Sequence, residues 1–165
     1  MTIDKIIFLD IDGPMIPTTS ILLDRNASWS QTLDGRCVRV LHLILKKSGA
    51  KVVFNSTHNR MLYDEPEGLL KIMEEDGVSS PGLVKRFIDA GFEDYLHSEV
   101  CTIYPDLDRL AAINLWLSEN GSTEDTLWVA FDDVFLNDDR AYLTSYSLGI
   151  GSGEYNHAAF YLGFK

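Results

Sequence analysis

Three short apolar runs divide the chain, and each run ends in polar side chains. The runs cover residues 5–9, 51–54 and 126–131, and they are rich in Ile, Val and Phe. Short continuous apolar runs of this kind are typical of strands that are buried on both faces of a parallel sheet. The pattern therefore predicts three buried strands.

Between the runs, apolar residues recur with the spacing of helices that bury one face. Such patterns follow Gly35, Pro66 and Pro105. Their apolar positions are Val38, Leu41 and Leu45; Leu69, Leu70 and Met73; and Leu107, Leu110, Ile113 and Leu117. Because strands and helices alternate, we predict an α/β fold with a doubly wound parallel sheet in a three-layer α/β/α arrangement. The stretch 14–33 is a candidate for a flap, and packing into the core is the alternative interpretation of its Trp29.

Each predicted strand carries its polar cluster at its carboxyl end. The clusters are Asp10-Ile11-Asp12-Gly13, Asn55-Ser56-Thr57 and Asp132-Asp133. In open α/β sheets, ligands bind outside the carboxyl ends of the strands, where the strand order reverses. We therefore expect the three clusters to converge on one crevice although they are far apart in the sequence.

The residue types in these clusters suit phosphoryl transfer. Asp10 would attack phosphorus as a nucleophile, and Asp12 would serve first as general acid and then as general base. A carboxylate and a phosphomonoester repel each other, so the attack needs a hard cation. Asp10 together with Asp132 or Asp133 supplies oxygen ligands, which predicts Mg²⁺. A local turn is the competing interpretation of Asp-x-Asp-Gly alone.

Two further groups are candidates for binding the phosphoryl oxygens and balancing their charge. The hydroxyl of Ser56 or Thr57, with nearby backbone N–H groups, would bind the oxygens, although both residue types also cap helices. Arg109 or a nearby lysine would balance the negative charge. A surface pair of Arg109 with Asp106 or Asp108 is the alternative interpretation.

These residues resemble the four motifs of the haloacid dehalogenase-like hydrolases, in order and over nearly the whole chain. The first motif, at residues 10–13, matches the nucleophile, the acid/base and the turn glycine, with Pro14 in place of the usual Val or Thr. The second, at 52–57, places the phosphate-binding position at Asn55, Ser56 or Thr57. Arg109 is the best match to the third, where a lysine is commoner.

The fourth motif, at residues 128–133, is an apolar strand that ends in two acids. The resemblance implies that Asp133 binds Mg²⁺ directly, while Asp132 and Asp138 orient it or bind through water. The predicted metal set is thus Asp10, Asp12, Asp132 and Asp133. The predicted substrate contacts are Gly13, Asn55, Thr57 and Arg60. Arg60 would either bind a second phosphate or the leaving group, or lie in solvent, and the two interpretations have equal weight.

Composition narrows the choice of partners and location. With 165 residues, of which 45% are hydrophobic, the chain is predicted to be a single domain over 1–165 without a large cap. A net charge of −11 disfavours a broad nucleic-acid surface, but a single terminal phosphate needs little basic area. Cys37 and Cys101 are expected to be buried thiols in a reducing compartment. No stretch has membrane-spanning length, so we expect a cytoplasmic protein without a membrane partner.

The sequence thus predicts an enzyme, a Mg²⁺-dependent phosphomonoesterase that works through an aspartyl-phosphate. Its substrate would be a small phosphorylated molecule or a nucleic-acid end. A neighbouring subunit of a homo-oligomer is one way to close an uncapped site. The rival hypothesis is a binding or regulatory module with little turnover, motivated by Pro14, Asn55 and the absence of a clear third-motif lysine.

Overall fold

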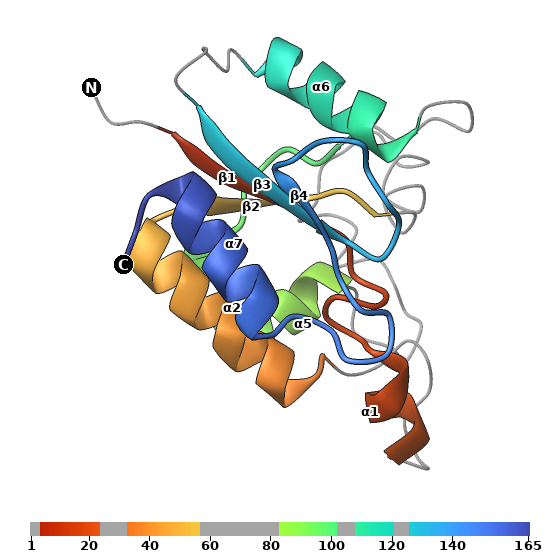
Figure 1. Ribbon diagram of the computed structural model, residues 1–165. Helices are drawn as coiled ribbons and strands as arrows, with labels where there is room; N and C mark the ends of the chain where they lie inside the picture. Colours follow the sequence, from red (N-terminus) through yellow and green to blue (C-terminus); the bar gives the residue numbers. More distant parts are fainter. Residues whose placement is uncertain (1–3, 24–32, 57–82, 102–107, 121–125) are drawn as a thin grey trace, which may run out of the picture.

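The computed structural model describes residues 4–23, 33–56, 83–101, 108–120 and 126–165 (Figure 1). Thr57 and Arg60 lie outside these ranges, as does the helix predicted after Pro66. The first motif, at residues 10–13, Arg109 of the third motif, and the fourth motif, at residues 128–133, all lie within the described residues.

The centre of the fold is a parallel sheet of four strands in the order β2-β1-β3-β4. The strands are β1 (Lys5–Leu9), β2 (Lys51–Phe54), β3 (Leu127–Asp132) and β4 (Ala141–Leu143). The three predicted strands are confirmed, and β3 is shifted by one residue. β4 was not predicted because it has three residues, none of them fully buried, at the edge of the sheet.

Helices cover both faces of the sheet, which confirms the predicted α/β fold with its parallel sheet (Figure 1). On one face lie α2 (Gly35–Ser48), α5 (Leu83–Asp89) and α7 (Ser152–Leu162), and on the other lies α6 (Arg109–Glu119). The helices predicted after Gly35 and Pro105 are confirmed as α2 and α6.

The strand β1 explains why the sheet needs two covers. Its side chains alternate between the faces, so that Ile7 and Leu9 join the core under α2 and α7 while Ile6 and Phe8 join the core under α6. A strand that is apolar at every position is stable only when both faces are covered. Cys37 and Cys101 are both buried, as predicted, and lie in these two different cores.

The helix ends follow local side-chain chemistry. Asp34 caps α2 by accepting hydrogen bonds from the N–H groups of Arg36 (2.8 Å) and Cys37 (3.1 Å). Asp108 caps α6 by accepting from the N–H of Ala111 at 2.7 Å. Carboxylates are favoured here because the first turn of a helix leaves backbone donors without partners.

The segment after the first motif contains the short helix α1 (Thr18–Leu23). The N–H groups of Thr18 and Thr19 donate to the carbonyl oxygens of Tyr146 (3.1 Å) and Ser147 (3.4 Å). The predicted flap region is therefore attached, at its start, to the loop that follows β4. A final helix-like turn, η1 (Glu93–Tyr95), lies between α5 and α6. In the described part of the chain, no helix has the length and apolar character needed to cross a membrane.

Candidate active site

Strand register places Asp10, Asn55 and Asp132 at the same level, because each directly follows one of three paired strand residues. Leu9 at the end of β1 is paired with Phe54 on one side and with Phe131 on the other. The N–H of Asp10 donates to the Phe131 oxygen at 3.0 Å, and the N–H of Asn55 donates to the Leu9 oxygen at 2.9 Å. The chain runs from β1 to one neighbour and later to the other, so this is the point where strand order reverses.

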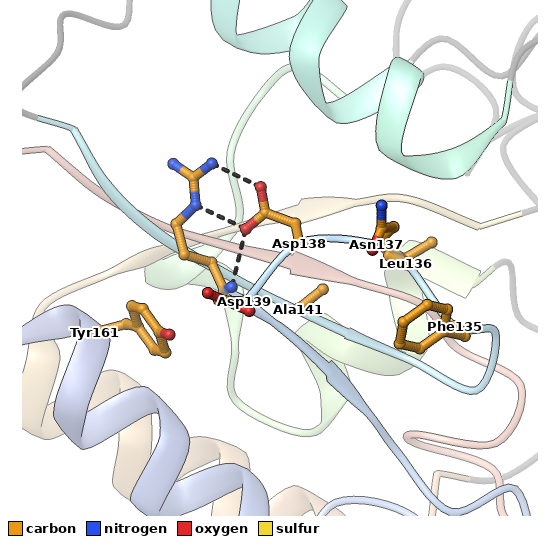
Figure 2. Close-up of a pocket in the computed structure, with 8 residues that line it drawn as sticks. Phe135, Leu136, Asn137, Asp138, Asp139, Ala141 and Tyr161 are labelled. Carbon is orange, nitrogen blue, oxygen red and sulfur yellow. Dashed lines mark hydrogen bonds and ion pairs between the residues drawn. The ribbon is translucent and has the colours of Figure 1, made fainter.

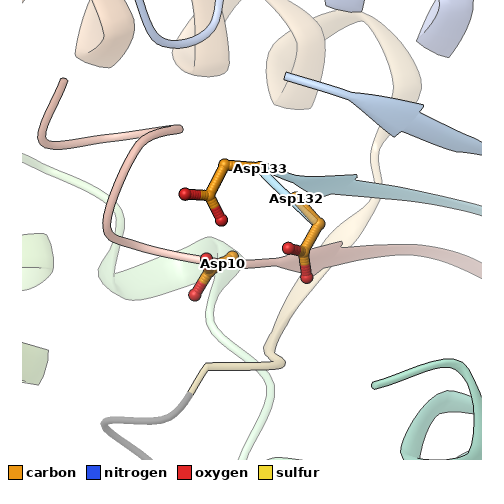
Figure 3. A group of neighbouring side chains, drawn as sticks. All are labelled: Asp10, Asp132 and Asp133. Atoms are coloured by element: carbon orange, nitrogen blue, oxygen red, sulfur yellow. The ribbon is translucent and has the colours of Figure 1, made fainter. Parts of the chain in front are cut away.

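Three carboxylates gather at this point. Asp10, Asp132 and Asp133 each offer one oxygen such that all three oxygens lie within 4.8 Å of one another (Figure 3). Asp10 and Asp132 are almost fully buried, at 2% and 1% exposed, and Asp133 is half-buried. Within the described residues, Asp12 adds no carboxylate to this group; its backbone forms a bridge with Ile16 in the turn after β1.

Arg109 neutralises part of this charge. Its Nη1 lies 2.9 Å from Asp10 Oδ2 and 2.9 Å from Asp132 Oδ2, with only 16% of the side chain exposed. Of the two proposed surface partners, Asp108 instead caps α6, and Asp106 lies outside the described residues. The structure therefore favours the interpretation of Arg109 as a charge-balancing residue of the site over that of a surface pair.

Burial shapes the titration of the two inner carboxyls. It raises the pKa of Asp10, against the lowering influence of Arg109, the Ile11 N–H and the Ser56 side chain. It also raises the pKa of Asp132 to about 7, together with the negative charge of Asp10 and against the influence of Arg109. Burial removes water from around a carboxylate, which disfavours its ionised form unless nearby positive charges and hydrogen-bond donors offset the loss.

The donor set fits a hard divalent cation. Three carboxylates and one guanidinium leave two negative charges when all groups are ionised. Asp10 Oδ1 is buried and has no hydrogen-bond partner among the described residues. A buried carboxylate oxygen without a partner is costly. Oxygen-only ligands are those that Mg²⁺ prefers, so Asp10, Asp132 and Asp133 are the residues that would hold it.

The second strand tip supplies a hydroxyl and an amide. Ser56 is fully buried and its side chain interacts with the Asp10 carboxylate. Asn55 is 1% exposed, and its amide is bonded to the backbone of α6. Of the three candidates for the second-motif position, Ser56 is thus the one that contacts Asp10, whereas Thr57 lies outside the described residues.

Gly13 is in close contact with Asp133. It has a φ of 82°, and a Cβ atom there would lie 2.9 Å from the Asp133 Cβ and 3.2 Å from its carboxyl carbon. Any larger residue would push Asp133 away, and a positive φ itself favours glycine. Gly13 therefore allows the first and fourth motifs to approach each other, which is a different contribution from the predicted substrate contact.

The resemblance implied that Asp138 is an additional acid of the metal site. The structure does not include Asp138 in the group of Asp10, Asp132 and Asp133. Its carboxylate binds Arg140 through both oxygens, at 2.9 Å to Nε and 2.7 Å to Nη2 (Figure 2). The loop after β3 turns back along the sheet to begin β4, and Arg140 packs 4.0 Å above the Trp128 ring. Asp138 thus stabilises this loop.

One buried polar residue at the sheet edge was not singled out from the sequence. Thr144 directly follows β4 and is 2% exposed. Its N–H donates to the backbone oxygen of Asp132 at 2.7 Å. Its Oγ1 has no hydrogen-bond partner among the described residues. The signal in the sequence is Tyr142-Leu143-Thr144-Ser145, a weak copy of the pattern in which an apolar run ends in hydroxyls.

The comparisons with known proteins agree with this geometry. The model of the family described as the HAD domain in Swiss Army Knife RNA repair proteins matches residues 6–150. The chain belongs to this family. The matched range contains β2, β3, β4, all of β1 except Lys5, and every charged residue of the site, so the resemblance to haloacid dehalogenase-like hydrolases is confirmed for this HAD domain. No curated protein and no solved structure matches the chain.

Proposed function

We propose that this HAD domain is a Mg²⁺-dependent phosphomonoesterase that uses Asp10 as its nucleophile. The observation that carries the proposal is the buried group of Asp10, Asp132 and Asp133 at the switch point of the sheet, with Arg109 between two of them. Mg²⁺, when bound by these carboxylates, would offset the repulsion between the nucleophile and the phosphate.

The residues of the chain supply the remaining chemistry. A carboxylate oxygen of Asp10 forms the new bond to phosphorus as the bond to the leaving oxygen breaks, and Asp12 gives that oxygen its proton. Asp12 then takes a proton from water, which attacks phosphorus and releases phosphate and Asp10. Ser56 and Arg109 would bind the phosphoryl oxygens, whose negative charge needs oriented donors throughout.

The short distances between motifs in the sequence support a single domain without a large cap. An open site of this kind accepts a phosphate on a bulky molecule. The family description names RNA repair proteins, and this favours a polynucleotide end as the second candidate substrate beside small phosphate esters. The net charge of −11 is compatible with an enzyme that binds the terminal phosphate rather than a long tract of backbone.

The test is hydrolysis of an aryl phosphate with and without Mg²⁺. Asp10→Asn should lower the rate by roughly 10⁵-fold or more, to background, as expected when a nucleophile is removed. Asp139→Asn, the same change at an exposed position of the loop before β4, should keep the native rate. Hydrolysis that persists in Asp10→Asn would refute the covalent mechanism.

A substrate comparison separates the candidates. RNA oligonucleotides with a 5′- or a 3′-phosphate should be compared with the aryl phosphate by kcat/KM at fixed salt concentration. A large preference for one RNA end would assign the polynucleotide role. If the native protein binds Mg²⁺ and phosphate but hydrolyses none of these esters, the binding-module hypothesis replaces the phosphatase.

A further inference from the structure

Asn55 and Arg109 are joined by two reciprocal hydrogen bonds. Asn55 Nδ2 donates to the backbone oxygen of Arg109 at 3.2 Å, and Arg109 Nη1 donates to the backbone oxygen of Asn55 at 3.2 Å. Asn55 is itself tied to the central strand, because its N–H donates to the Leu9 oxygen at 2.9 Å. The pair therefore links the start of α6 to the middle of the sheet.

This link acts on the nitrogen that serves the carboxylates. The same Nη1 of Arg109 lies 2.9 Å from both Asp10 Oδ2 and Asp132 Oδ2. An arginine side chain has about 2 kcal/mol of rotamer entropy to lose when it is held in one place. A charge alone would draw it toward either carboxylate, whereas the backbone oxygen of Asn55, which accepts a hydrogen bond from Nη1, is an acceptor held in place by the sheet.

The orientation of the Asn55 amide is set by its partner. The Arg109 backbone oxygen accepts hydrogen bonds and cannot donate, so it requires the NH₂ side of the amide. The other side, Oδ1, is buried without a hydrogen-bond partner among the described residues. Asn55 is 1% exposed, and its single described side-chain bond is made to α6.

We infer that Asn55 is a positioning residue for Arg109, which it holds between Asp10 and Asp132 in place for the transferred phosphoryl group. The inference rests on the proposed function, and the substrate contact expected for Asn55 from the sequence stays a separate prediction.

A double-mutant cycle tests this inference through turnover. Asn55→Ala and the similarly sized Asn55→Leu should each lower kcat for the aryl phosphate by roughly 10- to 100-fold, the scale expected for a misplaced catalytic group, with little change in KM. In an Arg109→Ala background the same changes should cost nothing further. Asn114→Ala, on the exposed side of α6, is the matched control. Equal losses in both backgrounds would overturn the inference.

A second measurement does not depend on turnover. In the native protein, the ¹⁵N side-chain signals of Arg109, assigned by their loss in Arg109→Ala, should report a restrained guanidinium. In Asn55→Leu, the chemical shifts of these signals should move toward the averaged values of solvent-exposed arginines. In Asn114→Ala, they should stay unchanged. Unchanged signals in Asn55→Leu would refute the positioning role. Absent hydrolysis with a clear signal change would refute the phosphatase and leave the positioning of Arg109 intact.

Discussion

At the scale of single residues, the site is a problem of charge balance. Asp10 and Asp132 share the Nη1 atom of Arg109, and Asp133 adds a third carboxylate nearby. One guanidinium cannot neutralise two buried acids and a half-buried one, and burial raises the pKa of Asp10 and of Asp132. Metal affinity and stability should therefore both depend on pH, in opposite directions.

Mg²⁺ affinity should fall as the solution is acidified below pH 7. The pKa of Asp132 is raised to about 7, and the cation binds the ionised carboxylate, so each pH unit below this value should weaken binding by about tenfold for this group. Calorimetric titration with Mg²⁺ between pH 5.5 and 8.5 measures the slope. Asp132→Asn should bind more weakly with a flatter slope, and a native affinity that is independent of pH would contradict the assignment.

The metal-free protein should show the opposite trend in stability. Because the folded pKa of Asp132 is higher than its ordinary value of 3.8, the folded state holds the extra proton between these values. The contribution of this group to the free energy of unfolding therefore decreases as pH rises from about 4 to 7. Saturating Mg²⁺ should reduce or reverse this decrease, which urea unfolding with and without the cation would detect.

At the scale of elements, Asp34 fixes the start of α2 and also holds α1. Its carboxylate accepts hydrogen bonds from Arg36, Cys37 and the hydroxyl of Ser20 in α1. Burial acts to raise the pKa of Asp34, but these hydrogen bonds outweigh it and hold the pKa well below its usual range. The ionised carboxylate therefore stabilises the folded state.

Asp34→Ala should lower the free energy of unfolding by about 1 kcal/mol at pH 7, the usual effect of losing a helix cap. A depressed pKa gives stability that is present above the ordinary value of 3.8 and is lost as pH falls below it. The deficit of Asp34→Ala should therefore shrink at pH 3, whereas Asp34→Asn retains a cap without this pH dependence. An equal deficit at both pH values, measured by urea unfolding, would contradict the role of the charge.

At the scale of the whole molecule, several distant segments meet beneath the active site. Gly149 has a φ of 69°, and a Cβ there would lie 2.5 Å from Cys37 Sγ and 2.8 Å from the Pro14 oxygen. The N–H of Ile150 donates to that same oxygen at 3.0 Å. The turn after the nucleophile, the first turn of α2 and the loop before α7 therefore depend on one glycine.

Gly149→Ala should lower the free energy of unfolding by about 2–4 kcal/mol, from the positive φ and from crowding in a packed core. Gly49→Ala is the control, because its φ of 70° is similar but no atom lies within 4 Å of the added Cβ. The control should lose about 1 kcal/mol, from the positive φ alone. Equal losses in thermal or urea unfolding would show that crowding at Gly149 is relieved elsewhere.

Much of the fold was predictable from the sequence because its elements have local causes. Apolar runs that need two covered faces specified β1, β2 and β3, and amphipathic spacing specified α2 and α6. The short strand β4 was missed because three edge residues, two half-buried and one exposed, leave no periodic signal. The clustering of Asp10 and Asp132 followed from strand ends alone, since parallel strands present their carboxyl ends at one edge.

The sequence by itself determined the residue types, the order of the motifs and the edge of the sheet where they meet. Tertiary structure decided which atoms touch. It placed Arg109 on two carboxylates, assigned Asp138 to Arg140, and turned the Asn55 amide toward α6. These contacts depend on how helices and loops pack against the sheet. Local sequence patterns do not predict this packing, because it joins residues that are far apart in the sequence.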